Sequence, residues 1–278
     1  MKWSTLPVLL LLALGQDAEA APRVRIVSLA PSLTELAYAA GAGDAMVGTV
    51  EYSDYPAAAL ALPRVGDAWS VDAEAVLALR PDLVLSWPSG TPEGTVARLR
   101  SLGVKVVEIP TFRLTDVATA LRSIGRIAGT DAIAEAAARR YEAQIRDLRA
   151  SHAGARRLGV FIEIDDEPLY TVNGRHVISE VVDLCGGGNV FADLSQLAPP
   201  VTIEAVIARD PDVILSTDDT IGDPAALWRR WSGLKAVKAG TIYSMSSDTL
   251  TRSTPRLAFG AGEVCAAFDD ARKRLSVR

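Results

Sequence analysis

A stretch of thirteen residues occurs twice in this chain, and the repeat limits the folds that the chain can adopt. Residues 74–86 read EAVLALRPDLVLS and residues 204–216 read EAVIARDPDVILS, so eight of the thirteen positions are identical at a constant offset of 130. Each copy has the pattern of a short helix, a Pro-Asp turn and a buried apolar strand. Two copies are too few for a solenoid. The repeat therefore predicts two similar α/β lobes that face each other across a cleft.

The N-terminus has the layout of a secretory signal. Lys2 is followed by an apolar run at residues 6–14 and by the small-residue sequence Ala18-Glu19-Ala20. This order of charged, apolar and small residues predicts a signal peptide at 1–20, cleaved after Ala20. The apolar run is too short for a membrane span. We therefore expect a soluble, exported protein.

Export gives a meaning to the two cysteines, Cys185 and Cys265. In an oxidising compartment two cysteines commonly form one disulfide, which here would close a loop of 80 residues. Metal ligation is the alternative, but neither cysteine has a partner at metal-ligand spacing. The favoured interpretation is a structural disulfide.

Charge and motifs argue against several classes of function. Removal of residues 1–20 takes away Lys2, Asp17 and Glu19 and leaves 28 basic and 32 acidic residues. Because the mature chain is mildly acidic, its net charge does not indicate nucleic-acid binding. His152 and His176 are the only histidines, and we interpret both as solvated surface residues rather than zinc ligands. The chain has no phosphate loop and no nucleophile elbow. No residue is therefore assigned a catalytic or metal-binding role.

Strand-like and helix-like segments alternate along most of the chain. We expect strands at 24–29, 47–50, 83–87 and 104–109 in the first half, with Ser32 capping a helix through Glu35 in a capping box. The second half restarts with a strand at 157–164, a helix at 177–184 that stops at Gly186-Gly187-Gly188, a strand at 241–245 and a closing helix at 254–275. Alternation of this kind predicts two Rossmann-like lobes with mainly parallel sheets, at 23–128 and 153–278.

The segment between the two lobes has a different pattern. Residues 114–151 contain no proline and no strand-like run, and their apolar residues recur at helical spacing. Two helices with a break at Gly129-Thr130 fit this pattern, the second over 131–149. A core helix is the simple interpretation, but the position between the repeats favours a long interlobe helix at 129–152. Such a link would restrict the lobes to small relative motions.

Aromatic residues make up only 6% of the chain, and several of them follow predicted strands. Tyr52 and Tyr55 come directly after one strand, Trp87 directly after another, and Trp69 lies in the loop before the first repeat copy. Loops at the carboxyl ends of parallel strands line the usual ligand crevice. Core packing can explain any one of these aromatic residues, but the group predicts a flat apolar ligand surface. Equivalent loops of the second lobe contain Tyr170, Asp248 and Arg252.

Glu74 and Glu204 are equivalent residues of the repeat, each at the start of its helix. An acidic residue at this place is favoured by the positive end of the helix dipole, and that alone explains the residue type. Two matched acids, one on each lobe, would also suit docking onto a two-fold partner with basic pockets. Both interpretations remain open from the residues alone.

Several motifs of the chain resemble the periplasmic cobalamin-binding proteins of bacterial cobalamin importers. They are VSLAPSLTEL at 27–36, YSDYP at 52–56, LRPDLV at 79–84, CGG at 185–187 and STPR at 253–256, and the resemblance covers nearly all of residues 23–278. It implies two α/β lobes joined by one long helix. It also implies a ligand between the lobes, which in the broader family is cobalamin, haem or a ferric siderophore.

The resemblance also assigns roles to individual residues. Tyr52 matches a cobalamin-contacting tyrosine, Glu74 and Glu204 match acids that meet arginines on the membrane permease, and Cys185 with Cys265 matches a family disulfide. Thr249 and Ala198 stand where tryptophans are expected, so the second lobe offers less aromatic cover. The contacting loop of that lobe corresponds to Asp248, Thr249, Leu250, Thr251 and Arg252.

The combined expectation is a monomeric substrate-binding protein of an ABC importer. It would carry cobalamin or a related corrinoid as its transported ligand, with no cofactor, and would deliver it to a permease and ATPase complex. A haem or ferric-siderophore carrier of the same fold is the first alternative, with Tyr52 as an iron ligand. An enzyme of the cell envelope that uses the same cleft is the second.

Overall fold

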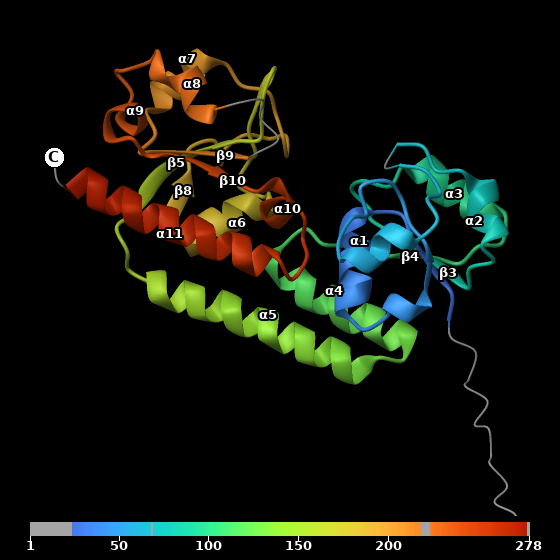
Figure 1. Ribbon diagram of the computed structural model, residues 1–278. Helices are drawn as coiled ribbons and strands as arrows, with labels where there is room; N and C mark the ends of the chain where they lie inside the picture. The colour runs from blue at the N-terminus through green and yellow to red at the C-terminus, as the bar shows by residue number, and fades with distance from the viewer. Residues whose placement is uncertain (1–23, 68, 218–222, 277–278) are drawn as a thin grey trace, which may run out of the picture.

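The computed structural model describes residues 24–67, 69–217 and 223–276. The expected signal peptide at 1–20 lies outside these residues. Within them the chain forms two α/β lobes, which lie side by side above a pair of long helices (Figure 1). No helix in these ranges is both long enough and apolar enough to cross a membrane.

Each lobe is built on a four-stranded parallel sheet, and the two sheets have the same topology. The first has the strand order β2-β1-β3-β4 and the second the order β8-β5-β9-β10, with every pairing parallel. The fold class predicted from the repeat is therefore confirmed. The strands are β1 Ile26–Ser28, β2 Met46–Gly48, β3 Leu83–Ser86 and β4 Val106–Glu108, then β5 Leu158–Glu163, β8 Gly187–Asn189, β9 Val213–Thr217 and β10 Ile242–Met245.

The repeated Pro-Asp turn has the same structural role in both lobes. The Asp82 carboxylate accepts a hydrogen bond of 2.7 Å from the backbone N–H of Arg25, next to β1. The Asp212 carboxylate accepts one of 2.8 Å from the backbone N–H of Gly159 in β5. Each aspartate thus satisfies a backbone donor of the neighbouring central strand, and this explains why the turn is retained in both copies.

Short helices cover the sheets of both lobes. The helix predicted at 177–184 is confirmed, and the closing helix predicted at 254–275 is found at 257–276. Helices α9 and α10 were not predicted. The helices of the two lobes are α1 Pro31–Ala39, α2 Ala73–Ala78, α3 Glu93–Ser101, α6 Val177–Leu184, α7 Ile203–Arg209, α8 Pro224–Arg229, α9 Lys235–Ala239, α10 Ser247–Leu250 and α11 Leu257–Ser276, with 3-10 turns η1 Gly43–Ala45 and η2 Ala57–Ala61.

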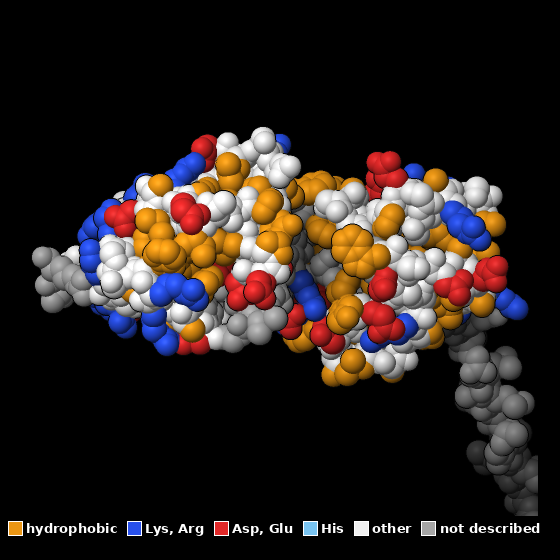
Figure 2. Space-filling model, turned by 90° about the horizontal axis from the view of Figure 1, so that it is seen from above, with side chains coloured by type: hydrophobic (Ala, Val, Ile, Leu, Met, Phe, Trp, Pro, Cys, Tyr) orange, Lys and Arg blue, Asp and Glu red, His pale blue; other side chains and the backbone are white. Residues whose placement is uncertain are grey.

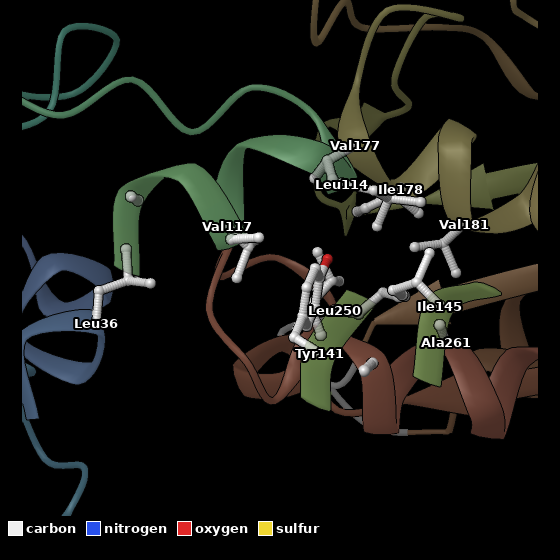
Figure 3. Packing of buried hydrophobic residues seen from close by; sticks show 14 of the residues in the cluster. Leu36, Leu114, Val117, Tyr141, Ile145, Val177, Ile178, Val181, Leu250 and Ala261 are labelled. Carbon is white, nitrogen blue, oxygen red and sulfur yellow. The ribbon is translucent and has the colours of Figure 1, made fainter. Parts of the chain in front are cut away.

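Two long antiparallel helices connect the lobes. They are α4, Leu114–Ala128, and α5, Asp131–His152, and the chain reverses between them at Gly129, whose φ of 70° is the left-handed conformation that glycine favours. One cluster of buried apolar side chains runs from α1 through α4 and α5 to α6 and α11. Figure 3 shows this packing, with Leu36 of α1 at one end and Val181 of α6 at the other. Because the core is shared, wide separation of the lobes would expose apolar surface.

The structure corrects two local predictions. Ser32 does not cap α1, because the helix begins at Pro31 with Ala30 as its N-cap; the fixed φ of proline suits the first helical position. The glycine run after α6 is more than a helix stop, since Gly187 and Gly188 belong to strand β8. A Cβ at Gly187 would lie 2.6 Å from the ring of Phe268, so glycine allows α11 to pack closely on this strand.

The predicted disulfide is present. Cys185, at the end of α6, is bonded to Cys265 of α11, with 4.8 Å between their Cα atoms. We expect the double substitution Cys185→Ser with Cys265→Ser to lower the free energy of unfolding by about 2 to 5 kcal/mol, because the unfolded chain loses a cross-link over a long loop. Denaturant unfolding of the oxidised protein, the reduced protein and the variant measures this effect. Equal midpoints for all three would contradict it.

Candidate functional site

The cleft between the lobes contains a cavity of about 430 Å³. Its walls come from segments that follow β1, β3, β4 and β5, from the start of α6, and from the loop after α10. Figure 2 shows the two halves of the molecule on either side of this hollow, with apolar side chains along both edges. The lining residues are Leu29, Ala30, Pro31, Ser32, Trp87, Gly90, Thr111, Ile164, His176, Ile178, Thr251, Arg252 and Ser253.

Tyr52 projects from the loop after β2. Its side chain is 77% exposed, and its backbone has a φ of 62°, a left-handed conformation that is strained for tyrosine. A buried hydroxyl network anchors the loop, since Thr49 donates to Ser53 at 2.7 Å and lies 2.6 Å from the hydroxyl of Thr34. An exposed aromatic ring held on strained backbone is a feature typical of binding sites.

Two tryptophans accompany Tyr52 on the first lobe. Trp69 is 85% exposed, and its loop is shaped by Asp67, which accepts hydrogen bonds from the backbone N–H groups of Trp69 and Ser70 at 2.8 and 2.7 Å. Trp87 is partly buried and lines the cavity. Its ring lies against Gly90, where a Cβ would come within 2.3 Å of the indole. Of the three aromatic residues, Trp87 therefore belongs to the cavity wall, whereas Tyr52 and Trp69 are exposed and are not among the residues that line the cavity.

Arg252 is the charged residue of the cavity wall, and three carboxylates surround it. Its guanidinium lies 3.1 Å from Glu35 of α1, 2.9 Å from Asp54 after β2, and 2.9 Å from Asp248 of α10. Glu35 and Asp54 belong to the first lobe, whereas Arg252 and Asp248 belong to the second. These contacts therefore join the lobes at the cleft.

Arg256 adds a second link between the lobes. It donates two hydrogen bonds to Glu35, at 2.9 and 2.6 Å, and its guanidinium lies 4.2 Å from the centre of the Tyr55 ring. Glu35 is only 3% exposed, so its carboxylate depends on these arginines for its polar contacts. Glu35, Asp54, Asp248, Arg252 and Arg256 together are called the interlobe charge cluster below.

The cluster affects the titration of Asp54. Partial burial raises the pKa of this carboxyl, but the hydrogen bond and the positive charge of Arg252 outweigh burial and lower the pKa below its ordinary value. Asp54 is therefore ionised at neutral pH. With Glu35 and Asp248 also acidic, three carboxyl groups face two guanidiniums in this cluster.

The structure corrects the interpretation of both histidines as solvated. His176 is the N-cap of α6, where its Nδ1 accepts a hydrogen bond of 3.2 Å from the backbone N–H of Ile178. Burial lowers the pKa of His176 to about 4, so the ring is neutral at physiological pH. His152 packs against the closing helix, with Nε2 3.3 Å from Asp269.

Glu163, at the end of β5, is a second buried titratable group near the cleft. Burial raises its pKa to about 7, while the Trp228 indole, which donates to its carboxylate at 3.0 Å, acts in the opposite direction. Its neighbour Ile164 lines the cavity. Glu163 thus joins helix α8, which contains Trp228, to the second-lobe wall of the cleft.

The remaining predicted contact residues occupy different places. Thr251 lines the cavity beside Arg252, and Tyr170 lies partly buried in β7, Leu169–Tyr170, which pairs with β6, Asp165–Asp166. Leu250 is fully buried in the shared core, and Thr249 is nearly so. Leu250 and Thr249 therefore pack beneath the loop that contains Thr251 and Arg252, on its core side, and we do not assign them to the ligand surface.

Glu74 and Glu204 occupy equivalent positions on the two lobes. Each is exposed in the first turn of its helix, α2 or α7, after an N-cap residue, Asp72 or Thr202, whose side chain accepts backbone hydrogen bonds. Within the described ranges neither carboxylate has a hydrogen-bond or ion-pair partner. The helix dipole still accounts for their residue type, and their exposure leaves both free to meet a partner.

A larger cavity of about 610 Å³ lies away from the cleft, beside α4, α6 and β8. Its charged residues largely neutralise each other, since Arg113 pairs with Glu180 at 2.7 Å and Arg157 with Asp183 at 2.9 Å. It contains none of the predicted contact residues, so we assign the candidate site to the smaller cleft cavity.

Sequence reasoning missed three residues of the cleft. Glu35 was assigned to a helix cap, His176 to the surface, and Arg256 only to a motif. For Glu35 and Arg256 the signal was available, since both belong to motifs that carry the family resemblance. For His176 no local signal indicated burial, because its surroundings come from distant parts of the chain.

Comparison with known proteins identifies the family. The model of the family described as "Periplasmic binding protein" matches residues 26–249. The chain belongs to the periplasmic binding protein family. These are substrate-binding transport proteins rather than enzymes; they are periplasmic and work with the permease and ATPase of an ABC importer.

Relatives within the periplasmic binding proteins include two vitamin B12-binding proteins. That of Vibrio cholerae serotype O1 is 36% identical over 254 residues, covering 91% of this chain and 92% of the relative. That of Yersinia pestis strain Pestoides F is 35% identical over 260 residues, covering 93% and 90%.

Solved structures of the family agree with the two-lobe fold. The periplasmic vitamin B12 binding protein BtuF of Vibrio cholerae superimposes with a TM-score of 0.84 at 36% identity, covering 91% of this chain and 99% of that one. The periplasmic heme-binding protein BhuT in complex with two hemes superimposes with a TM-score of 0.80 at 25% identity, covering 89% and 98%. The fold is thus shared by binding proteins for different ligands.

Proposed function

We propose that this chain is the periplasmic substrate-binding protein of an ABC importer and that it captures cobalamin or a related corrinoid in the cleft. It then delivers this ligand to the membrane permease, without bond chemistry. The observation that carries the proposal is the cleft itself, which is lined by Trp87 and apolar residues of the first lobe and by a polar loop with Arg252 of the second. The similarity to vitamin B12-binding proteins over nine-tenths of the chain supports it.

The chemistry of the two walls suits a corrinoid. A corrinoid is a large flat macrocycle with amide side chains around its rim. Tyr52, Trp69 and Trp87 supply apolar surface for the macrocycle. Arg252 donates from Nη1 to Glu35 and Asp54 and pairs through Nη2 with Asp248, and a guanidinium has five N–H donors, so we expect donors to remain for amide oxygens of the rim. We include Tyr170 and Thr251 as further contacts of the second lobe.

The same proposal covers the organisation of the chain. We assign residues 23–128 and 153–278 to the lobes and 129–152 to the interlobe helix. Residues 1–20 would direct export and be removed near Ala20. Because the apolar core is continuous through α4 and α5, we expect capture to involve small motions of the lobes, and we expect the protein to act as a monomer.

Ligand retention tests the proposal. The mature protein is mixed with cyanocobalamin, with haemin or with a ferric hydroxamate siderophore and passed through a desalting column, and the absorbance of the protein fraction is recorded. We expect the corrinoid spectrum in the protein fraction. Retention of haemin or the siderophore, with no corrinoid retained, would assign the chain to the alternative ligand class.

Tyr52→Ala is expected to weaken cobalamin binding by about 1 to 3 kcal/mol, because a stacked aromatic ring and its buried area are lost. This corresponds to roughly a fivefold to hundredfold rise in Kd, measured by calorimetry. Phe259→Ala is the matched control, since Phe259 is also an exposed aromatic residue but lies over α5 and α11, away from the cleft. If both variants bind like the wild type, Tyr52 has no role in the ligand surface.

A further inference from the structure

His176 faces the cleft with one ring nitrogen already occupied. Its Nδ1 accepts the hydrogen bond from Ile178 N–H, so in the neutral ring the proton must be on Nε2. The side chain is part of the wall of the 430 Å³ cavity. Across the described ranges, Nε2 has no hydrogen-bond partner. The ring therefore presents an N–H donor, rather than a metal-binding lone pair, on the cavity side.

The surroundings of His176 decide what kind of acceptor it can take. Arg252, which also lines the cavity, carries a positive charge that is opposed by Glu35, Asp54 and Asp248. Arg256, also paired with Glu35, supplies the second positive charge. Three carboxylates against two guanidiniums leave a surplus of negative charge beside the cavity. A carboxylate on a ligand would meet repulsion there, whereas an amide would not.

We propose that His176 is a ligand-binding residue that donates a hydrogen bond to an uncharged carbonyl oxygen, and that the interlobe charge cluster selects amide-bearing ligands over carboxylate-bearing ones. The low pKa of His176 agrees with this role, because a neutral ring attracts a carboxylate less strongly than a charged ring would. The inference rests on the proposed function, since it names the chemical feature by which the cleft recognises a corrinoid.

The first test removes the donor but keeps the helix cap. In His176→Asn the side-chain oxygen can still accept from Ile178 N–H, since asparagine is a favoured N-cap, but no N–H reaches the cavity. We expect the Kd for cyanocobalamin to rise about tenfold, from the loss of a buried hydrogen bond, with an unchanged thermal unfolding midpoint. Unchanged affinity in the folded variant would overturn the role of His176. If His176→Asn unfolds early, His176→Ser replaces it and is judged by the same two measurements, because serine is also a favoured N-cap and its short side chain carries no N–H.

The second test compares ligands that differ in one group. Each of the three monocarboxylic acids of cyanocobalamin has one amide replaced by a carboxylate, and calorimetry measures each with the wild type and with Asp54→Asn. We expect at least one acid to bind about tenfold more weakly than cyanocobalamin, and Asp54→Asn to reduce that difference. Equal affinities for all four ligands would refute the selection. Failure of the wild type to bind cyanocobalamin would instead contradict the proposed function.

Discussion

Uptake is expected to stop when Glu74 and Glu204 are both replaced by alanine, while ligand capture stays nearly unchanged. Both acids are exposed, one on each lobe, and neither lines the cleft cavity. Charge pairs at an interface control the rate and orientation of association, so their loss should prevent docking on the permease. Uptake of labelled cobalamin by cells with the cognate importer measures the first effect, and calorimetry on the purified variant measures the second.

Asp131 provides the control that separates docking from the helix dipole. It is an exposed acid in the first turn of α5, so its dipole contribution should resemble that of Glu74 and Glu204. Asp131→Ala should therefore leave uptake intact. If the double variant transports as well as Asp131→Ala does, the two acids serve only their helices and the docking proposal fails.

Glu35→Ala is expected to lower the free energy of unfolding by about 3 to 5 kcal/mol, because it leaves two partly buried guanidiniums without their shared carboxylate. The contacts of 3.1 Å to Arg252 and 2.6 Å to Arg256 are lost together. Arg252 would also lose a partner that holds it in the cavity wall, so cobalamin should bind more weakly. Denaturant unfolding and calorimetry measure the two effects.

An exposed ion pair is the control for Glu35. Arg100 and Glu108 lie 2.8 Å apart on the surface of the first lobe, with about half of each side chain exposed. Glu108→Ala should lower the free energy of unfolding by less than about 1 kcal/mol and leave ligand binding unchanged. A Glu35→Ala variant no less stable than Glu108→Ala would show that the interlobe charge cluster contributes little to holding the lobes together.

The two-lobe fold was predictable because each repeat copy contains complete local information. The helix, the turn and the strand follow from residues next to each other, and the same turn recurs in three dimensions. Arg80 and Asp210, at equivalent places in the repeat, both adopt left-handed backbone with φ of 47° and 41°. The break at Gly129 was predictable for the same reason, since a glycine ends a helix by its own conformational preference.

The parts of the site that the sequence did not predict depend on contacts between distant residues. Glu35 and Arg256 are 221 positions apart, and no local pattern indicates that they meet across two lobes. The surroundings of His176 likewise come from distant parts of the chain, because residues of both lobes line the cavity that it faces. Strand β8 was not predicted because glycine is rare in strands. The strand forms by pairing with β5, and glycine is needed at Gly187 because Phe268 leaves no room for a larger side chain.

Capture of a corrinoid in the cleft can be measured by calorimetric titration of the mature protein with cyanocobalamin. A parallel titration with haemin under the same conditions serves as the comparison. We expect one corrinoid per protein molecule with a Kd below about 1 μM, and much weaker or no binding of haemin. Saturable haemin binding together with no heat from cyanocobalamin would contradict it.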